Sequence, residues 1–224
     1  MDGEVGTDPA RTHTRENLMK FPRKSLAVIG AAALVSIGSA AYAGPPWTVS
    51  VGGSSTGSPA SYTAATVGTN PDITFTVPGL TLTCDDGTAA GTITPGATGT
   101  DGKAGEITST SFNTCNGPYG IALNVTQNTT WDINLDSDNV GGVTPGNIGN
   151  VDASVSNPGG ACDFDVTGSV GGSFDESTQQ LAVSGGGLTV SNVSGCFGLI
   201  ANADPATFDG TYQLANIANI TIAN

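Results

Sequence analysis

The chain has 224 residues, with 19 acidic and only 6 basic side chains, which gives a formal net charge of −13. Such an acidic surface repels phosphate backbones and lacks the basic side chains of nucleic-acid recognition, so we exclude nucleic acid as a partner. Charged residues make up only 11% of the chain and hydrophobic residues 38%, so we expect a folded protein rather than a disordered one.

The first 43 residues predict a leader with a cleaved secretory signal peptide. A basic segment at residues 20–24 precedes an apolar run over residues 26–37, and residues 41–43 read Ala-Tyr-Ala, an A-x-A cleavage site. The apolar run is shorter than the about 20 residues that cross a bilayer. We expect translation to start at Met19 and the mature chain to begin at Gly44. The protein is thus predicted to be secreted, to act outside the cell or at its surface, and to have no transmembrane segment in its mature chain.

The mature chain is predicted to be rich in β-strands. Residues 44–69 form a Gly/Ser-rich amino segment with one expected strand at 47–51, and residues 70–224 are expected to form one domain. Apolar residues alternate with hydroxyl residues, which is typical of half-buried strands. Clusters of Gly, Asn, Ser and Asp between these runs indicate turns. The alternating runs lie at residues 73–77, 80–84, 121–125, 131–135, 181–183, 188–193 and 217–222. We therefore predict an all-β fold, an antiparallel β-sandwich that is immunoglobulin-like or jelly-roll-like.

Two stretches that each contain a cysteine after an alternating run resemble one another. They read ITSTSFNTCNG at residues 107–117 and LTVSNVSGCFG at residues 188–198. A Thr-aromatic pair follows each cysteine at the same distance, ending in Trp131 and in Tyr212. We infer an internal repeat, so that the sandwich is built from two pseudo-repeats with Trp131 and Tyr212 at matching places.

Four cysteines in an exported chain predict two disulfides, because the exterior is oxidising. Four cysteines permit three pairings. The internal repeat favours Cys84 with Cys115 and Cys162 with Cys196, since each bond then closes a loop within its own half. A structural metal site is the alternative interpretation, but the mature chain has no histidine and no CxxC spacing.

The chemistry that remains in the mature chain argues against an enzyme. Lys103 is its only basic residue, and the only histidine, His13, lies in the leader. Ser-His-Asp and Cys-His catalytic sites then cannot form, so we expect no enzymatic activity, no catalytic residues and no cofactor. A glycoside hydrolase that uses paired carboxylates is a remote alternative. Its acids would be Asp85 with Asp86, or Asp136 with Asp138.

The stretch DINLDSDNVGG is a candidate for binding calcium. Its oxygen ligands are of the kind that hard cations prefer, and they are Asp132, Asp136, Asp138 and Asn139. The stretch lacks a third alternating ligand and the distal Glu of an EF-hand loop. We therefore expect an exposed hairpin turn here and assign no metal site.

The runs TLTC, TSTSFNTCNGPYGIALNVTQNTTWDINL, CDFDVTGSVGGSF and VSNVSGCFGLI resemble a family of secreted four-cysteine actinobacterial proteins of unassigned function, over roughly residues 70–215. The order Cys, Cys, Trp, Cys, Cys on short strands is more distantly similar to the secreted alkane-oxidation activator proteins of pseudomonads. That second resemblance implies a non-catalytic extracellular accessory protein that helps cells to contact hydrophobic substrates. Neither family supplies catalytic residues.

Two classes of function therefore stay open. The first is a structural or accessory protein outside the cell or at its surface, which assembles through exposed strands with itself or with cell-surface components. The second is a binding module that holds a hydrophobic small molecule, a lipid or a hydrocarbon, in an apolar pocket. The two classes differ in whether the apolar faces of the strands enclose a cavity, and a sequence pattern does not show this.

Overall fold

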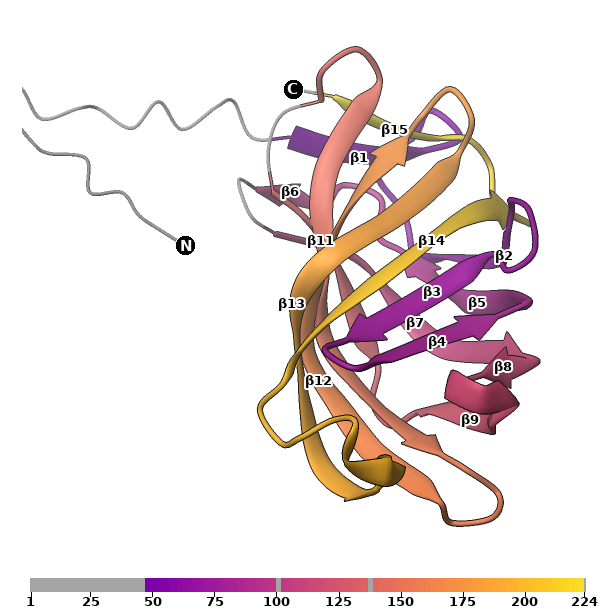
Figure 1. The fold of residues 1–224 in the computed structure, drawn as a ribbon. Coiled ribbons are helices and arrows are strands. Elements are labelled where there is room, and N and C mark those ends of the chain that lie inside the picture. Colours follow the sequence, from indigo (N-terminus) through magenta and orange to yellow (C-terminus); the bar gives the residue numbers. More distant parts are fainter. Residues whose placement is uncertain (1–46, 100–101, 137–138, 224) are drawn as a thin grey trace, which may run out of the picture. The chain divides into compact units, whose positions relative to one another are not determined.

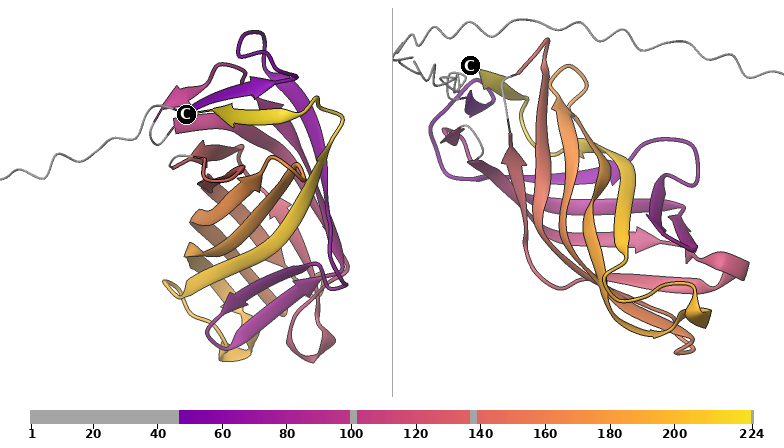
Figure 2. Two further views of the ribbon diagram at one scale, coloured as in Figure 1. Left: turned by 90° about the horizontal axis from the view of Figure 1, so that it is seen from above. Right: turned by 60° about the vertical axis from the view of Figure 1, so that its left-hand side comes forward.

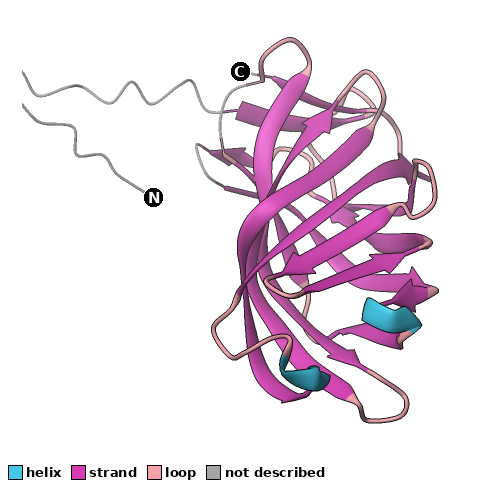
Figure 3. Ribbon diagram, in the orientation of Figure 1, coloured by secondary structure: helices cyan, strands magenta, loops and turns pink. Residues whose placement is uncertain are grey.

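The computed structural model describes residues 47–99, 102–136 and 139–223. The leader, the expected start at Met19 and the expected cleavage site after Ala43 lie outside the described residues. Within the described ranges all regular elements are β-strands except two short 3-10 turns (Figure 3), so the predicted all-β class is confirmed. None of the helical segments in these ranges is long and apolar enough to span a membrane.

The elements follow one another with short connections. In chain order they are β1 (Trp47–Val51), β2 (Ala60–Thr66), β3 (Ile73–Val77), β4 (Leu80–Cys84), β5 (Asp86–Ile93), β6 (Thr98–Gly99), β7 (Gly102–Asn113), β8 (Cys115–Asn116), the turn η1 (Pro118–Gly120), β9 (Ala122–Gln127), β10 (Trp131–Leu135), β11 (Val143–Ser156), β12 (Cys162–Asp175), β13 (Gln180–Gly195), the turn η2 (Cys196–Gly198), β14 (Pro205–Ala215) and β15 (Ile220–Ala223).

One layer of the sandwich consists of the long strands β11, β12, β13 and β14, which pair in chain order as antiparallel neighbours (Figure 1). The facing layer contains two groups of shorter strands, in the orders β10-β7-β5-β2 and β9-β8-β4-β3. Two turned views show how these groups face the long strands (Figure 2). The predicted antiparallel sandwich is therefore present.

Both groups of short strands hydrogen-bond to the outer long strands. On β11, residues 146–149 pair with β10 and residues 153–156 pair with β9. On β14, residues 207–210 pair with β3 and residues 212–215 pair with β2. Each described strand of the twelve-stranded sheet consequently has a neighbour on both of its sides. The apolar faces of all these strands point into one shared interior.

Glycines and β-bulges interrupt the long strands midway. The register shifts between Ile148 and Val151 in β11 and between Gly168 and Gly172 in β12. Gly168 has φ of 134°, and a Cβ atom there would lie 2.2 Å from the carbonyl oxygen of Gly187 in β13. Only glycine permits so close an approach of two backbones, which lets the strands bend toward the facing layer.

A separate three-stranded sheet, ordered β15-β1-β6, lies across one end of the sandwich, at the top of Figure 1. Its apolar side chains Trp47, Val49, Ile220 and Ile222 are buried in the same core as the two layers. Side chains of the β12–β13 turn hold the outer edge of β15, because Gln179 accepts a hydrogen bond from the N–H of Ile220 (2.8 Å) and donates one to its carbonyl (3.0 Å).

The amino segment differs from the prediction of one strand. Residues 47–51 form the expected strand β1, but residues 60–66 form a second strand, β2, that pairs with β5 and β14. Tyr62 and Ala64 are the buried positions of β2. The alternation is short and is set among Ser, Thr and Ala, which explains why the sequence pattern indicated only one strand in this segment.

The two halves share a strand order. The hairpin β5–β7 has β10 beside β7, and the hairpin β12–β13 has β14 beside β13. The expected match of Trp131 and Tyr212 does not extend to register. Trp131 lies opposite Ile107 in β7, whereas Tyr212 lies opposite Leu181 in β13 instead of Leu188, the counterpart of Ile107. Relative to the position of β10 beside β7, the strand β14 is therefore displaced along β13.

Both disulfides have the pairing that the repeat favours. Cys84 is bonded to Cys115 and Cys162 to Cys196, with sequence separations of 31 and 34 residues. All four cysteines are buried. Cys84 lies just before β5 and Cys115 just after β7, so their bond ties together the two ends of the β5–β7 hairpin. In the same way, the bond between Cys162, at the start of β12, and Cys196, just after β13, ties together the two ends of the β12–β13 hairpin.

Candidate functional site

An apolar cavity of ≈ 130 Å³ lies in the interior of the sandwich. Residues from both layers and from the three-stranded sheet line it, including Val49 in β1 and Ile222 in β15. A second hollow, between the segments that carry the turns η1 and η2, measures only ≈ 10 Å³. That volume corresponds to about one water molecule, so the large cavity is the candidate site.

Period-two alternation produces the apolar lining. In β10, Trp131, Ile133 and Leu135 are buried and line the cavity, while Asp132 and Asn134 between them are only partly buried. The same alternation applies in β12, where Val166 and Val170 face inward. Because successive side chains of a strand point to opposite faces, each strand contributes every second residue to the interior.

Small side chains at inward positions leave the cavity open. Ala64 in β2, Ala89 in β5, Ala104 in β7 and Ala153 in β11 all line it. Each occupies a place where a larger aliphatic residue would fill part of the volume. The aromatic rings of Phe112 and Phe208, with centroids 6.3 Å apart in an edge-to-face arrangement, form another part of the wall.

The lining contains polar residues but no charged residue among those described. The hydroxyl group of Tyr62 donates a hydrogen bond to the carbonyl oxygen of Glu106 (3.3 Å). Burial raises the pKa of Tyr62 and that of Tyr212 far above the usual value of a tyrosine. Both phenols therefore stay protonated and neutral, and the interior carries no formal charge.

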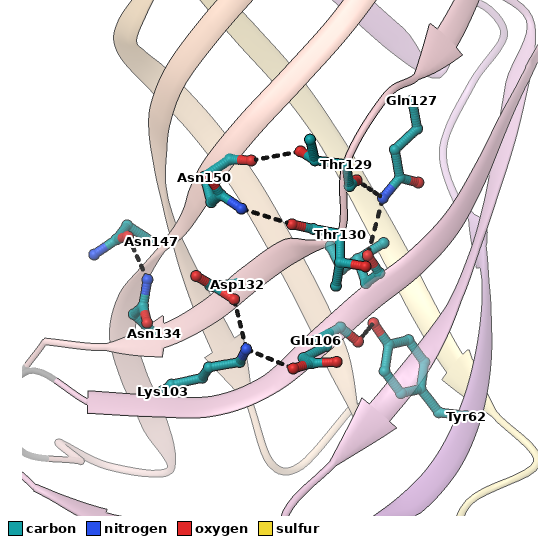
Figure 4. Close-up of polar contacts among 11 residues, drawn as sticks. Tyr62, Lys103, Glu106, Gln127, Thr129, Thr130, Asp132, Asn134, Asn147 and Asn150 are labelled. Atoms are coloured by element: carbon teal, nitrogen blue, oxygen red, sulfur yellow. Dashed lines mark hydrogen bonds and ion pairs between the residues drawn. The ribbon is translucent and has the colours of Figure 1, made fainter.

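The only basic side chain in residues 44–224, that of Lys103, lies outside this cavity, on the outer face of the sheet. Lys103 in β7 forms ion pairs with Glu106 (2.5 Å) and with Asp132 in β10 (2.7 Å) (Figure 4). Hydrogen bonds to Asp132 and to Glu106 raise the pKa of Lys103. The ammonium group thus links two neighbouring strands and is half-exposed to solvent.

Amide side chains join the strands where β9 ends and β10 begins. Gln127 donates to the carbonyl oxygens of Ile107 (2.9 Å) and Thr129 (2.7 Å), which ties β9 to β7. Asn150 in β11 donates to the carbonyl oxygen of Thr130 (2.9 Å) (Figure 4). These contacts hold the two groups of short strands together at their junction on the outer surface.

The acids considered for glycoside hydrolysis take part in contacts between strands. Asp86 accepts a hydrogen bond from the side chain of Asn113 (2.5 Å), and the backbone N–H of Asp85 donates to the carbonyl oxygen of Asn113 (3.1 Å). Asp136 accepts from the side chain of Asn147 (2.7 Å). None of these acids lines the cavity. Asp138 lies outside the described residues.

The residues considered for calcium have separate partners. Asp132 pairs with Lys103 and Asp136 with Asn147, whereas Asn139 donates to Glu176 and to the carbonyl oxygen of Ile222. Within the described residues no group of three or more His, Cys, Asp or Glu side chains could hold a metal ion. We therefore assign no metal ligands here.

We predict that Asp165 makes stability depend on pH in the acid range. Hydrogen bonds from Asn192 and Ser154, each 2.7 Å, lower the pKa of Asp165. Stabilisation from a lowered carboxyl pKa is complete above the unfolded value of about 3.9 and is lost as pH falls through the folded value. Asp165→Asn should lower the free energy of unfolding at pH 7 by less than about 1 kcal/mol, because solvent screens this carboxylate.

The difference between wild type and Asp165→Asn should shrink at pH 3 when both are unfolded with urea. Asp163→Asn, which removes a charge from the same face of β12, is the matched control. An Asp165→Asn effect that is unchanged between pH 7 and pH 3 would contradict the prediction.

Comparison with known proteins found no matching family model, no matching curated protein and no matching solved structure. The geometry of the cavity is consequently the main basis for a functional proposal. The only trace of the cavity in the sequence is the set of alanines at inward-facing positions of separate strands. Period-two alternation does not distinguish such positions from those of a filled core.

Proposed function

We propose that this protein is a non-catalytic binding module that holds a small apolar molecule in the cavity between its layers. The observation that supports this most directly is a space of ≈ 130 Å³ between the layers with a nearly all-apolar lining. Cavities of about 150 Å³ lined by aliphatic and aromatic side chains stay free of water and take up molecules of the size of benzene.

The volume favours a small hydrocarbon over a complete lipid. Drug-sized ligands occupy pockets of about 300–1,000 Å³, which is more than this cavity offers. We further propose that the protein acts outside the cell as an accessory that meets hydrophobic compounds, since two disulfides suit an oxidising environment. The acidic residues that face solvent would keep it soluble there.

A structural role through strand assembly is the second candidate. Its strand edges would have to come from the three-stranded sheet, because the described strands of the larger sheet all have two neighbours. Gln179 already satisfies the backbone groups of Ile220 on the outer edge of β15. Filaments of the pure protein in electron micrographs would support this candidate and would weigh against a simple soluble binder.

We predict saturable binding of benzene to the pure protein, measured by calorimetry or by NMR titration, with a dissociation constant at or below about 1 mM. Ala64→Leu should weaken that binding by at least about tenfold, because Ala64 lines the cavity and a leucine would occupy part of its volume. The matched control is Ala65→Leu on the same strand, where the side chain is exposed and affinity should stay unchanged.

Absence of saturable benzene binding by wild type would show that the proposal is wrong. Because Ala64→Leu adds volume to a packed interior and such additions cost about 1–3 kcal/mol, Ala153→Val provides a smaller change at another lining position. Equal affinity of wild type, Ala64→Leu and Ala153→Val for benzene would place any binding outside the cavity.

A further inference from the structure

Two hydroxyl oxygens interrupt the apolar lining without a hydrogen-bond partner. They belong to Thr144 in β11 and to Thr110 in β7, and both oxygens are buried. Among the lining residues described, these are the only buried side-chain oxygens or nitrogens that lack a partner. A hydroxyl group that is taken out of water without a partner destabilises the protein, so two such groups in one cavity require an explanation.

Thr144 is the more telling of the two because its side chain is 0% exposed. Its neighbours Val143 and Pro145 face solvent, so the alternation of β11 directs Thr144 inward. It lies opposite Phe174 in β12, which also lines the cavity. Valine has almost the same shape and would give this position a fully apolar side chain, yet the sequence has threonine.

The charge of the surroundings limits what could bond to that hydroxyl. No charged residue lines the cavity within the described part of the chain. Lys103, the only basic residue after the leader, is engaged with Glu106 and Asp132 on the outer face. A carboxylate or an ammonium ion inside would therefore be buried without a counter-ion, which is strongly unfavourable. The polar group of the ligand must be neutral.

We infer that the ligand is a neutral oxygenated hydrocarbon, an alcohol in the simplest case, whose oxygen hydrogen-bonds to the hydroxyl group of Thr144 while its carbon skeleton fills the apolar space. An alcohol suits this position because a threonine hydroxyl can both donate and accept. This inference rests on the proposed function, since it assumes that the cavity is the binding site. It adds that the cavity favours a ligand with one neutral oxygen-containing group over a purely apolar ligand and over a charged one.

The test compares three probes of similar size: benzene, phenol and benzoate. Affinities are measured by calorimetry at pH 7, where phenol is neutral and benzoate is charged. Thr144→Val should leave benzene affinity unchanged or slightly higher and should weaken phenol binding, so that the preference for phenol over benzene falls roughly three- to tenfold. Thr189→Val, at an exposed position of β13, is the matched control and should leave both affinities unchanged.

The outcomes separate this inference from the proposed function. If no probe binds to wild type, the cavity is not a binding site and both fail. If benzene and phenol bind but their ratio is the same in wild type and Thr144→Val, the apolar site stands and the role of Thr144 is wrong. A loss of phenol binding in Thr110→Val alone would assign the ligand oxygen to the other hydroxyl. Benzoate binding as tight as phenol binding would contradict the selection of neutral ligands.

Discussion

Replacing both cysteines of either disulfide with alanine should lower the free energy of unfolding by about 3–4 kcal/mol, as measured by urea denaturation. The bonds Cys84–Cys115 and Cys162–Cys196 close loops with sequence separations of 31 and 34 residues, and the loss of chain entropy in the unfolded state gives this magnitude. For a domain of this size the change corresponds to roughly 6–16 °C in melting temperature. Burial of all four cysteines means that reductant acts slowly unless the fold opens.

The two loops do not overlap in sequence, so their contributions should add when both pairs are replaced. The combined loss of about 6–8 kcal/mol is a large part of the 5–15 kcal/mol that stabilises an ordinary domain. The control is the same melt on wild type without reductant, in which mass spectrometry should detect no thiol that reacts with an alkylating agent. A melting temperature within about 2 °C of wild type for either double variant would show that its loop is already constrained in the unfolded chain.

Local alternation was sufficient to locate some of the short strands, such as β3 and β10, but not others, such as β2 and β5. The pattern Ile73, Phe75, Val77 marked β3, and Trp131, Ile133, Leu135 marked β10, each with the bounds that the structure has. The long strands were found only in part, because glycines interrupt their patterns. Gly185, Gly186 and Gly187 separate the two predicted runs at 181–183 and 188–193, which the structure joins into the single strand β13.

The cavity could not be predicted, because it depends on pairing between distant segments. β1 pairs with β15, so that Val49 lies opposite Ile222, and no local signal connects these positions. Thr144 sits in the run VTPGN, which has the composition of a turn, and its burial follows only from its place in β11. Residues 44–224 contain a single basic residue and no histidine, and this composition still limits the chemistry of the interior.

The glycines of this chain therefore have a structural role beyond forming turns. Several of them lie inside strands at points where a neighbouring backbone comes too close for any side chain. Cβ atoms at Gly146 and Gly172 would lie 2.2 Å and 2.6 Å from carbonyl oxygens of adjacent strands. Such contacts let the sheets curve around the cavity, so the high glycine content and the curvature of the sheets are connected.

Gly91→Ala should be the most damaging of these single substitutions. Gly91 lies at a bulge in β5, and a Cβ atom there would be 1.8 Å from the carbonyl oxygen of Glu106 and 3.0 Å from the hydroxyl oxygen of Tyr62. The carbonyl oxygen belongs to the backbone of β7 and accepts the hydrogen bond of Tyr62, so it cannot move aside without disturbing that contact. We expect a loss of at least about 3 kcal/mol in the free energy of unfolding, measured with urea, or failure to fold.

Gly186→Ala in β13 is the matched control, since it also lies at a bulge but has no atom closer than 3.6 Å to the added Cβ. Because alanine restricts the unfolded chain more than glycine does, Gly186→Ala should change stability by no more than about 1 kcal/mol. If Gly91→Ala destabilised the protein no more than Gly186→Ala, the strands β5 and β7 would have room to separate. The close approach at Gly91 would then not be a requirement of the fold, and the curvature around the cavity would need another cause.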